Sequence, residues 1–276
     1  MNRAPASIPG SGNNPWRRRL LIGVVLVYAG FLILAPLAAL VGGAFASGAG
    51  EIITALAEPD VLSAFWRTLL IAFISVAVHG VFGTAVAWVI VRQQFAGRRL
   101  LNALIDLPIA VSAVVVGYML LLLFGRNGLL GPLSQALNIR VAFALPGIIL
   151  ATLFVTLPFM VRELIPVLEA AGVDQEQAAA TLGASGWQTF WLVTLPALRW
   201  GFIYGLTLTF ARALGEFGAV LVVGGGIQGR TETATVYVFR ALEERQYAGA
   251  YGAALALGVL SLALVLGVDL IRRRQR

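Results

Sequence analysis

The chain has 276 residues, of which 59% are hydrophobic and only 12% are charged, a composition too apolar for an ordinary soluble domain. It contains no cysteine, which excludes disulfides and cysteine-based zinc sites, and no lysine, which excludes a P-loop ATPase. The net charge of +7 rests on arginines that lie beside hydrophobic runs, which indicates membrane orientation rather than nucleic-acid binding.

Six apolar runs are each long enough to cross about 30 Å of hydrocarbon as an α-helix. The runs are continuous rather than alternating, which favours helices over a β-barrel. We therefore expect an all-α integral membrane protein with a single transmembrane domain, residues 16–276, after a disordered tail, residues 1–15. The expected spans are residues 20–45, 68–91, 104–124, 143–161, 201–223 and 248–271, with a long loop at 162–200.

The arginines are distributed unevenly between the two sides of these spans. Thirteen lie on the side of both termini and of the loop 162–200, six lie on the other side, and Arg212 lies within a span. Because cytoplasmic segments are enriched in arginine, we expect both termini and this loop to be cytoplasmic.

Three further features of the spans have two interpretations each. Asp106 lies at the expected start of a span, two residues before Pro108, which favours an N-cap over a transport role. His79 lies inside the second span, where a contact between helices is favoured over a proton relay. The glycines 224–226 end the fifth span, either as a flexible loop or as a contact for a substrate-delivering protein.

The loop 162–200 contains signals for two short helices. Asp174 is expected to be an N-cap, with Gln177 completing a capping box, and the helix ends near Gly183, which suits a left-handed turn. Ser185 and Gln188 repeat the capping pattern for a second helix.

The loop ends at Pro196, which is expected to open the helix of the fifth span. Ala178, Ala179 and Ala180 give the first short helix a thin face that permits close approach of another protein. An ordinary amphipathic connector is the alternative.

Arg212 and Glu216 lie four residues apart in the fifth span, a spacing that allows an ion pair on one helix face. Charges at mid-bilayer cost roughly 2.5–3.5 kcal/mol on insertion scales, so both side chains should face protein or water. The pair either holds two spans together or lines a path for an anion.

The pattern of the loop resembles the EAA loop of ABC importer permeases, which reads Glu-Ala-Ala, three residues, Gly, nine residues, Ile-x-Leu-Pro. The matching positions are Ala178, Ala179, Gly183, Leu195 and Pro196, whereas Gln177 and Val193 replace the usual Glu and Ile. Glu176 points about 100° away on a helix and is not expected to substitute for the missing Glu at 177.

The resemblance extends over about residues 60–270 and is closest to the W-type subunits of sulfate/thiosulfate importers. It includes the segments 105–112, which ends in Ser112, 154–164, 183–188, which contains Ala184 and Ser185, and 211–220. Molybdate and tungstate permeases share the segment around Arg212 and Glu216, so that segment does not decide between the substrates.

The resemblance implies a type I importer permease fold in the bacterial inner membrane, with the loop 162–200 forming a coupling helix. It implies two separate ATPase subunits that bind ATP and Mg²⁺, a second permease subunit of the T type, and an external sulfate-binding protein. The chain itself would be non-catalytic and without a cofactor, and it would move sulfate or thiosulfate inward by alternating access.

The residues expected to couple to the ATPases are Asp174, Gln177, Ala178, Ala179, Gly183, Ala184, Ser185, Leu195 and Pro196. The candidates for the translocation path are Arg212, Glu216 and Ser112. Alternative functions are molybdate or tungstate import, an ATP-independent channel or secondary transporter, and an intramembrane enzyme, for which only Arg212 and Glu216 lie at matching depth.

Overall fold

The structure is a computed structural model that describes residues 15–46 and 48–274, so nearly all of the expected tail 1–15 lies outside the described residues. The described residues form helices joined by turns and loops. In chain order the elements are α1 Pro15–Ala46, α2 Ala49–Leu56, α3 Pro59–Val78, η1 His79–Gly83, α4 Thr84–Arg92, α5 Arg98–Ala110, α6 Ala113–Phe124, α7 Gly131–Ala136, α8 Leu145–Ala171, α9 Asp174–Thr181, α10 Gly186–Thr189, η2 Phe190–Thr194, α11 Leu195–Leu214, α12 Gly218–Gly224, α13 Ala234–Glu243 and α14 Tyr247–Arg274.

Four of the described helices are each long and apolar enough to cross a membrane, and two bent helix pairs could raise the number to six. The single helices are residues 16–46, 59–92, 145–171 and 247–271. The second of these runs without interruption through the π-helical turn η1.

The single span expected over 104–124 is instead two helices, α5 and α6, with an angle of 112° between them. Val111 and Ser112 have extended backbones at the break. The two helices differ in character, because α5 carries Asn102 and Asp106, which bind Arg162 on α8, whereas α6 is apolar throughout. The fifth span is likewise broken, between α11 and α12, by 56°.

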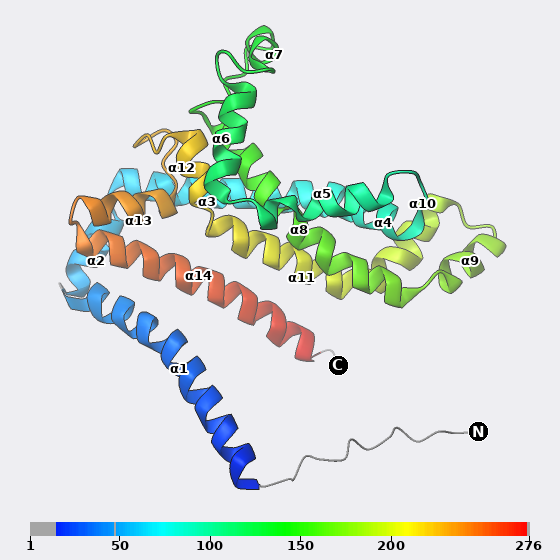
Figure 1. The fold of residues 1–276 in the computed structure, drawn as a ribbon, viewed down its shortest axis with the longest axis horizontal. Coiled ribbons are helices and arrows are strands. Elements are labelled where there is room, and N and C mark those ends of the chain that lie inside the picture. The colour runs from blue at the N-terminus through cyan, green and yellow to red at the C-terminus, as the bar shows by residue number, and fades with distance from the viewer. Residues whose placement is uncertain (1–14, 47, 275–276) are drawn as a thin grey trace.

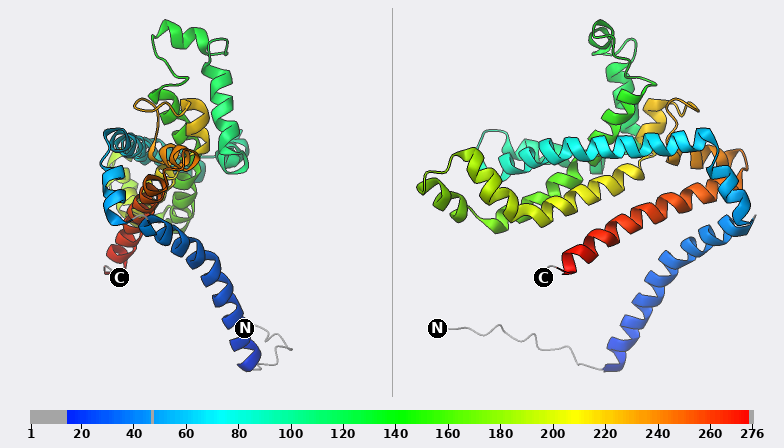
Figure 2. Two further views of the ribbon diagram at one scale, coloured as in Figure 1. Left: turned by 90° about the vertical axis from the view of Figure 1, so that its left-hand side faces the viewer. Right: turned by 180° about the vertical axis from the view of Figure 1, so that it is seen from behind.

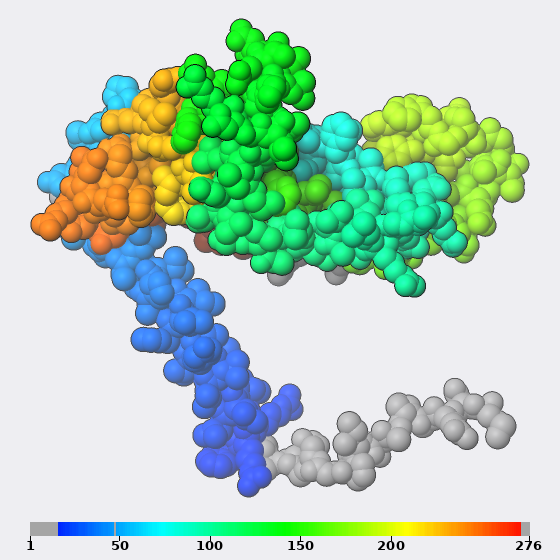
Figure 3. Space-filling model, turned by 45° about the horizontal axis from the view of Figure 1, so that its top comes forward, coloured from blue at the N-terminus to red at the C-terminus, as the bar shows by residue number. Residues whose placement is uncertain are grey.

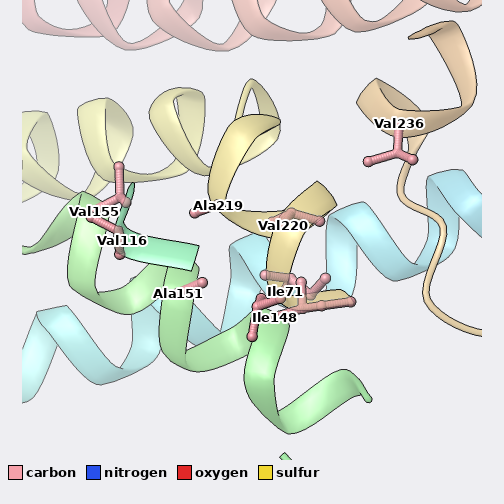
Figure 4. Packing of buried hydrophobic residues seen from close by; sticks show 9 residues of the cluster. Ile71, Val116, Ile148, Ala151, Val155, Ala219, Val220 and Val236 are labelled. Carbon is pink, nitrogen blue, oxygen red and sulfur yellow. The ribbon is translucent and has the colours of Figure 1, made fainter. Parts of the chain in front are cut away.

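Helix α8 forms the centre of the molecule. It continues to Ala171 rather than ending near residue 161, because Leu164 and Leu168 extend its buried face past the charged Arg162 and Glu163. The first half of α8 packs against α3, α6 and α12 through Ile148, Ala151 and Val155, as Figure 4 shows. The second half packs against α4, α5 and α11.

The ends of the molecule are occupied by different short helices. Figure 1 shows α9 and α10 at one end of the long axis and α2 and α13 at the other, and the right-hand view in Figure 2 shows the same arrangement from behind. Helix α1 projects away from the other helices (Figure 3) and contacts α14 where Gly43 meets Tyr251. Its apolar side chains are largely exposed, as suits a helix that faces lipid or another membrane subunit.

Close packing of α6 on α12 requires a glycine at 117. A Cβ atom added there would lie 2.7 Å from the carbonyl oxygen of Ala219 and 2.8 Å from Cβ of Val222. Gly117→Ala should therefore lower the free energy of unfolding by about 1–3 kcal/mol through overpacking. The measurement is thermal unfolding of the purified protein in lipid nanodiscs.

The matched control is Gly258→Ala in α14, where an added Cβ meets nothing within 4 Å. The same change there should be neutral or stabilise by up to about 1 kcal/mol, since alanine favours helix. Equal melting temperatures for the two variants would show that α6 and α12 do not pack this closely.

Candidate functional site

The segment between α8 and α11 folds into two short helices at one end of the molecule. The turn between them passes through Gly183, whose φ of +88° is the left-handed conformation expected from the sequence. Ser185 caps α10, and the predicted capping box with Gln188 is present, with both hydrogen bonds formed at 2.8 and 3.3 Å. Pro196 lies in the first turn of α11, as predicted.

The predicted capping box at the start of α9 is wrong. Asp174 is the first residue of the helix rather than its N-cap, Val173 occupies the cap position, and no side chain accepts a cap hydrogen bond there. The carboxylate of Asp174 lies in the first turn, where negative charge is favoured by the helix dipole. Asp174 and Gln177 are both exposed.

Helix α9 is attached to the membrane helices by an ion pair that the sequence analysis missed. Glu176 binds Arg92 at the end of α4 in a two-pronged contact, with both N–O distances 3.1 Å. The side chains are only 8% exposed for Arg92 and 19% exposed for Glu176, so water screens the pair weakly.

Arg92 and Glu176 also bind three other parts of the chain. Arg92 donates to the carbonyl oxygens of Leu168, at 3.1 Å, and Gly172, at 2.5 Å, which lie at the C-terminal end of α8. Thr194 in η2 donates to Glu176 at 2.9 Å. We call Arg92, Glu176 and Thr194 the clasp, because they join α4, α8, α9 and the start of α11.

Glu176 was not expected to take part because, on a helix, it points about 100° away from position 177. That rotation is what places its carboxylate against α4, whereas Gln177 faces outward. The signal that could have found it is a pair of opposite charges expected on the same side of the membrane, with Arg92 at the end of the second span and Glu176 shortly after the fourth. The clasp is therefore an ion pair within the chain, made by Glu176 and not by the residue at 177.

The outer face of the segment carries apolar side chains. Leu182 is 89% exposed, Leu192 74% and Trp187 71%. A groove of about 510 Å³ lies between α9 and the start of α11, lined mainly by small or apolar residues. They include Ala178, Ala179, Leu182, Leu192 and Pro196. Exposed apolar surface of this kind at the polar end of a membrane protein is typical of a docking site.

The second group of candidate residues lies at the break of the fifth span. The predicted ion pair is present, with Arg212 Nη1 2.8 Å from Glu216 Oε2. The predicted shared helix face is wrong, because α11 ends at Leu214 and Glu216 lies in the turn before α12. Glu216 accepts the N–H of Ala219 at 3.1 Å, so the carboxylate satisfies the positive end of α12 while Arg212 lies at the negative end of α11.

The break at Ser112 lies beside this turn. A Cβ atom added at Gly218 would lie 3.1 Å from Cγ2 of Val114, so the starts of α12 and α6 touch. Ser112 is exposed, and its side chain makes no cap hydrogen bond. The structure thus brings the breaks of two spans together, with Ser112 on one and Glu216 on the other.

Two other polar residues have structural roles. Asp106 is not an N-cap but lies within α5, where both its oxygens bind Arg162, at 2.6 Å from Nε and 2.5 Å from Nη2. His79 bridges helices, with Nε2 3.0 Å from the Leu153 carbonyl and 3.0 Å from Thr156 Oγ1, as the sequence favoured. Among the described residues, no group of three or more His, Cys, Asp or Glu could hold a metal ion.

A family model described as the inner membrane component of binding-protein-dependent transport systems matches residues 79–276. The chain belongs to this family. It is 48% identical, over 92% of its length and 89% of the relative, to the sulfate transport system permease protein CysW of Synechococcus elongatus. It is 38% identical to CysT of Escherichia coli K12, with 92% of each chain covered.

Among solved structures, a membrane chain of a bacterial ABC transporter that imports alginate has a TM-score of 0.78 at 18% identity. The likeness covers 94% of this chain and 96% of that one, and it shows the fold. The helical architecture expected from the sequence is therefore confirmed. The chain is a multi-pass membrane protein of this family.

The clasp leads to a prediction for this transport component. Glu176→Gln removes the charge that Arg92 binds, so α9 should open locally about 2 kcal/mol more easily. Hydrogen exchange of the amides of residues 177–182 should then be roughly thirtyfold faster. The adjacent exposed change Gln177→Glu should leave exchange within twofold of the parent protein, and equal exchange in both variants would show that the clasp does not hold α9.

Proposed function

We propose that this chain is the W-type membrane subunit of an ABC importer for sulfate. The observation that carries the proposal is the 48% identity to a sulfate permease subunit over nearly the whole chain. The geometry agrees, because an exposed short helix is held by the clasp at one end of the molecule. Sulfate and thiosulfate share charge and shape, and both are within the proposed substrate class.

The proposed complex contains two ATPase subunits, which bind ATP and Mg²⁺ and dock on α9 and its groove. A second permease subunit of the T type pairs with this chain, and similarity to CysT indicates that the two subunits share one fold. An external binding protein delivers the anion. The chain itself is non-catalytic and holds no cofactor.

We place α9, α10 and both termini in the cytoplasm. The support is the excess of arginine on that side, thirteen against six, and the position of Arg92 and Arg98 at the α9 end of the molecule. Residues 125–144, which precede α8, and residues 225–233, which follow α12, are then external.

Transport follows from a mechanical link between the ATPases and the two broken spans. ATP must bind more tightly to one state of the complex than to the other for closure of the ATPases to move the permease. The clasp passes motion of α9 to α4, α8 and α11, and α11 ends at the Arg212 break. The side of the membrane to which the path opens would then change with the ATPase state.

Arg212 is placed to face the anion path. Its side chain is 30% exposed whereas that of Glu216 is 1% exposed, so the pair leaves the guanidinium partly open. A divalent oxyanion needs donors to replace its water in the membrane. The neutralising carboxylate keeps the site weak, which suits an ion that must leave.

The function is tested with the assembled complex in proteoliposomes. Import of labelled sulfate should require ATP and the loaded binding protein, and excess molybdate or tungstate should not compete. Competition by molybdate would favour the molybdate alternative, and uptake by the purified chain alone would favour a channel or secondary transporter.

The turn at Gly183 provides a prediction about coupling. Gly183→Val forces a β-branched residue into a φ of +88°, which costs about 1–2 kcal/mol or more. We expect sulfate uptake to fall at least tenfold while the complex still assembles and hydrolyses ATP.

The matched control is Gly186→Val, since neither glycine has an atom within 4 Å of an added Cβ but only Gly183 has a positive φ. Normal uptake by Gly183→Val would show that the turn is not needed for coupling.

Arg212 gives a second prediction. In Arg212→Gln the anion path loses its positive charge, so uptake should fall at least tenfold while docking of the ATPases is unchanged. Arg199→Gln, which removes a charge that stacks on Trp200 at the other end of α11, should keep uptake within twofold. Normal uptake by an assembled Arg212→Gln complex would exclude Arg212 from the path.

A further inference from the structure

A cavity of about 680 Å³ lies at the end of α8 that is remote from α9. One wall is the connection from α6 through α7 to α8, and the other wall is the loop after α12. Helix α8 has 27 residues, so its length of about 40 Å separates this cavity from α9.

The cavity is strongly positive. Arg126, Arg140 and Arg230 line it, and no Asp or Glu is among its lining residues. The five ion pairs of the described part of the chain involve none of the three arginines. Asp60, on α3, accepts a hydrogen bond from Gln228 near this loop but does not line the cavity.

Uncharged polar side chains complete the lining. Ser134, Gln135 and Asn138 lie on and just after α7 and offer hydroxyl and amide groups. With the three arginines they form a set of donors suited to the oxygens of an anion.

The walls of the cavity are held in place by hydrogen bonds. The N–H of Phe143 donates to the carbonyl of Val223 at 2.8 Å, which joins the two walls. Arg67 donates to the carbonyl of Gly229 at 2.9 Å, and Thr231 donates to that of Gly224 at 2.7 Å.

The backbone beside the cavity is also strained. Phe143 has a positive φ angle of 55°, which a bulky side chain adopts only where the surrounding structure imposes it. Asn138, with a φ of 54°, ends α7 in the left-handed conformation that asparagine often adopts after a helix. Strain such as that at Phe143 clusters at ligand sites. The segment that carries Arg140 is thus fixed at both ends.

We propose that this cavity, the arginine basin formed by Arg126, Arg140 and Arg230, binds divalent oxyanions on the external face. The inference rests on the proposed function for the choice of sulfate and for the side of the membrane. A cleft lined by one sign of charge raises the local concentration of opposite ions.

The basin is a site of passage rather than a tight store. All three arginines are exposed, so salt screens their attraction. The volume far exceeds that of one tetrahedral oxyanion, so the ion exchanges readily and can move on.

The test reads the local charge directly. The chain has no cysteine, so Gln135→Cys in the assembled complex places one thiol of this chain in the basin. The partner subunits of this complex carry no cysteine. The rate at which the thiol is modified is measured with two methanethiosulfonate reagents, one that carries an anionic sulfonate and one that carries a cationic trimethylammonium group. Each rate is divided by that of a free thiol.

We expect the anionic reagent to react about tenfold faster than the cationic one. Arg140→Gln with Arg230→Gln should lower this ratio at least threefold, whereas Arg245→Gln should leave it unchanged. Arg245 lines a separate cavity of about 750 Å³ together with Glu51 and Glu58, and Thr54→Cys there should give a ratio near one. A ratio near one at Gln135→Cys would overturn the proposal.

Sulfate is then added at constant ionic strength, with chloride as the comparison. Selective slowing of the anionic reagent by free sulfate supports the site and identifies the bulk anion as its source. If the anionic reagent is slowed selectively only when the sulfate-loaded binding protein is present, the site is also supported, and its anion is delivered by that protein.

Two other outcomes would overturn the proposal. The first is no selective slowing under either condition. The second is equal slowing of both reagents by the binding protein alone, which would make the basin a protein-docking surface. These rates require no transport, so they can fail while ATP-dependent sulfate uptake succeeds, and the reverse.

Discussion

The ion pair between Arg92 and Glu176 is the contact on which the rest of the molecule depends. A helix of eight residues, such as α9, is too short to be stable in water by itself. Its order comes from the clasp, which satisfies the last carbonyls of α8 and the carboxylate of α9 with one guanidinium. Because the pair is largely buried, α9 is attached to the membrane helices as firmly as a packed element, although its outer face is free.

The same physical device recurs at the centre of the molecule, where charge compensates for a broken helix. The breaks near Ser112 and Gly215 expose backbone groups that lipid could not satisfy. Glu216 accepts a hydrogen bond from α12 and pairs with Arg212 at the end of α11. The two breaks lie where the starts of α6 and α12 touch, with Glu216 buried and Ser112 exposed. Charge and backbone breaks thus lie together at one point between the helices.

Apolar runs and turn residues predicted the helical membrane fold, the turn at Gly183 and the cap at Ser185, because each depends on local chemistry. The clasp, the pair between Asp106 and Arg162 and the basin join residues far apart in sequence, and no local pattern contains those contacts. The break of the third span was missed for the same reason, since hydropathy measures how apolar a run is and not its direction. Asp174 is not the cap because α9 begins at Asp174 itself, one residue earlier than a cap at this position would place the start of the helix.

Helix α9 should move with the membrane helices as one rigid unit. Spin labels at Gln94→Cys, after α4, and Gln177→Cys, on α9, would measure this in the assembled complex by electron–electron distance measurements, because the chain has no cysteine of its own. We expect one narrow distance distribution that is unchanged between the nucleotide-free and ATP-bound states. A shift of several ångströms between those states would contradict it.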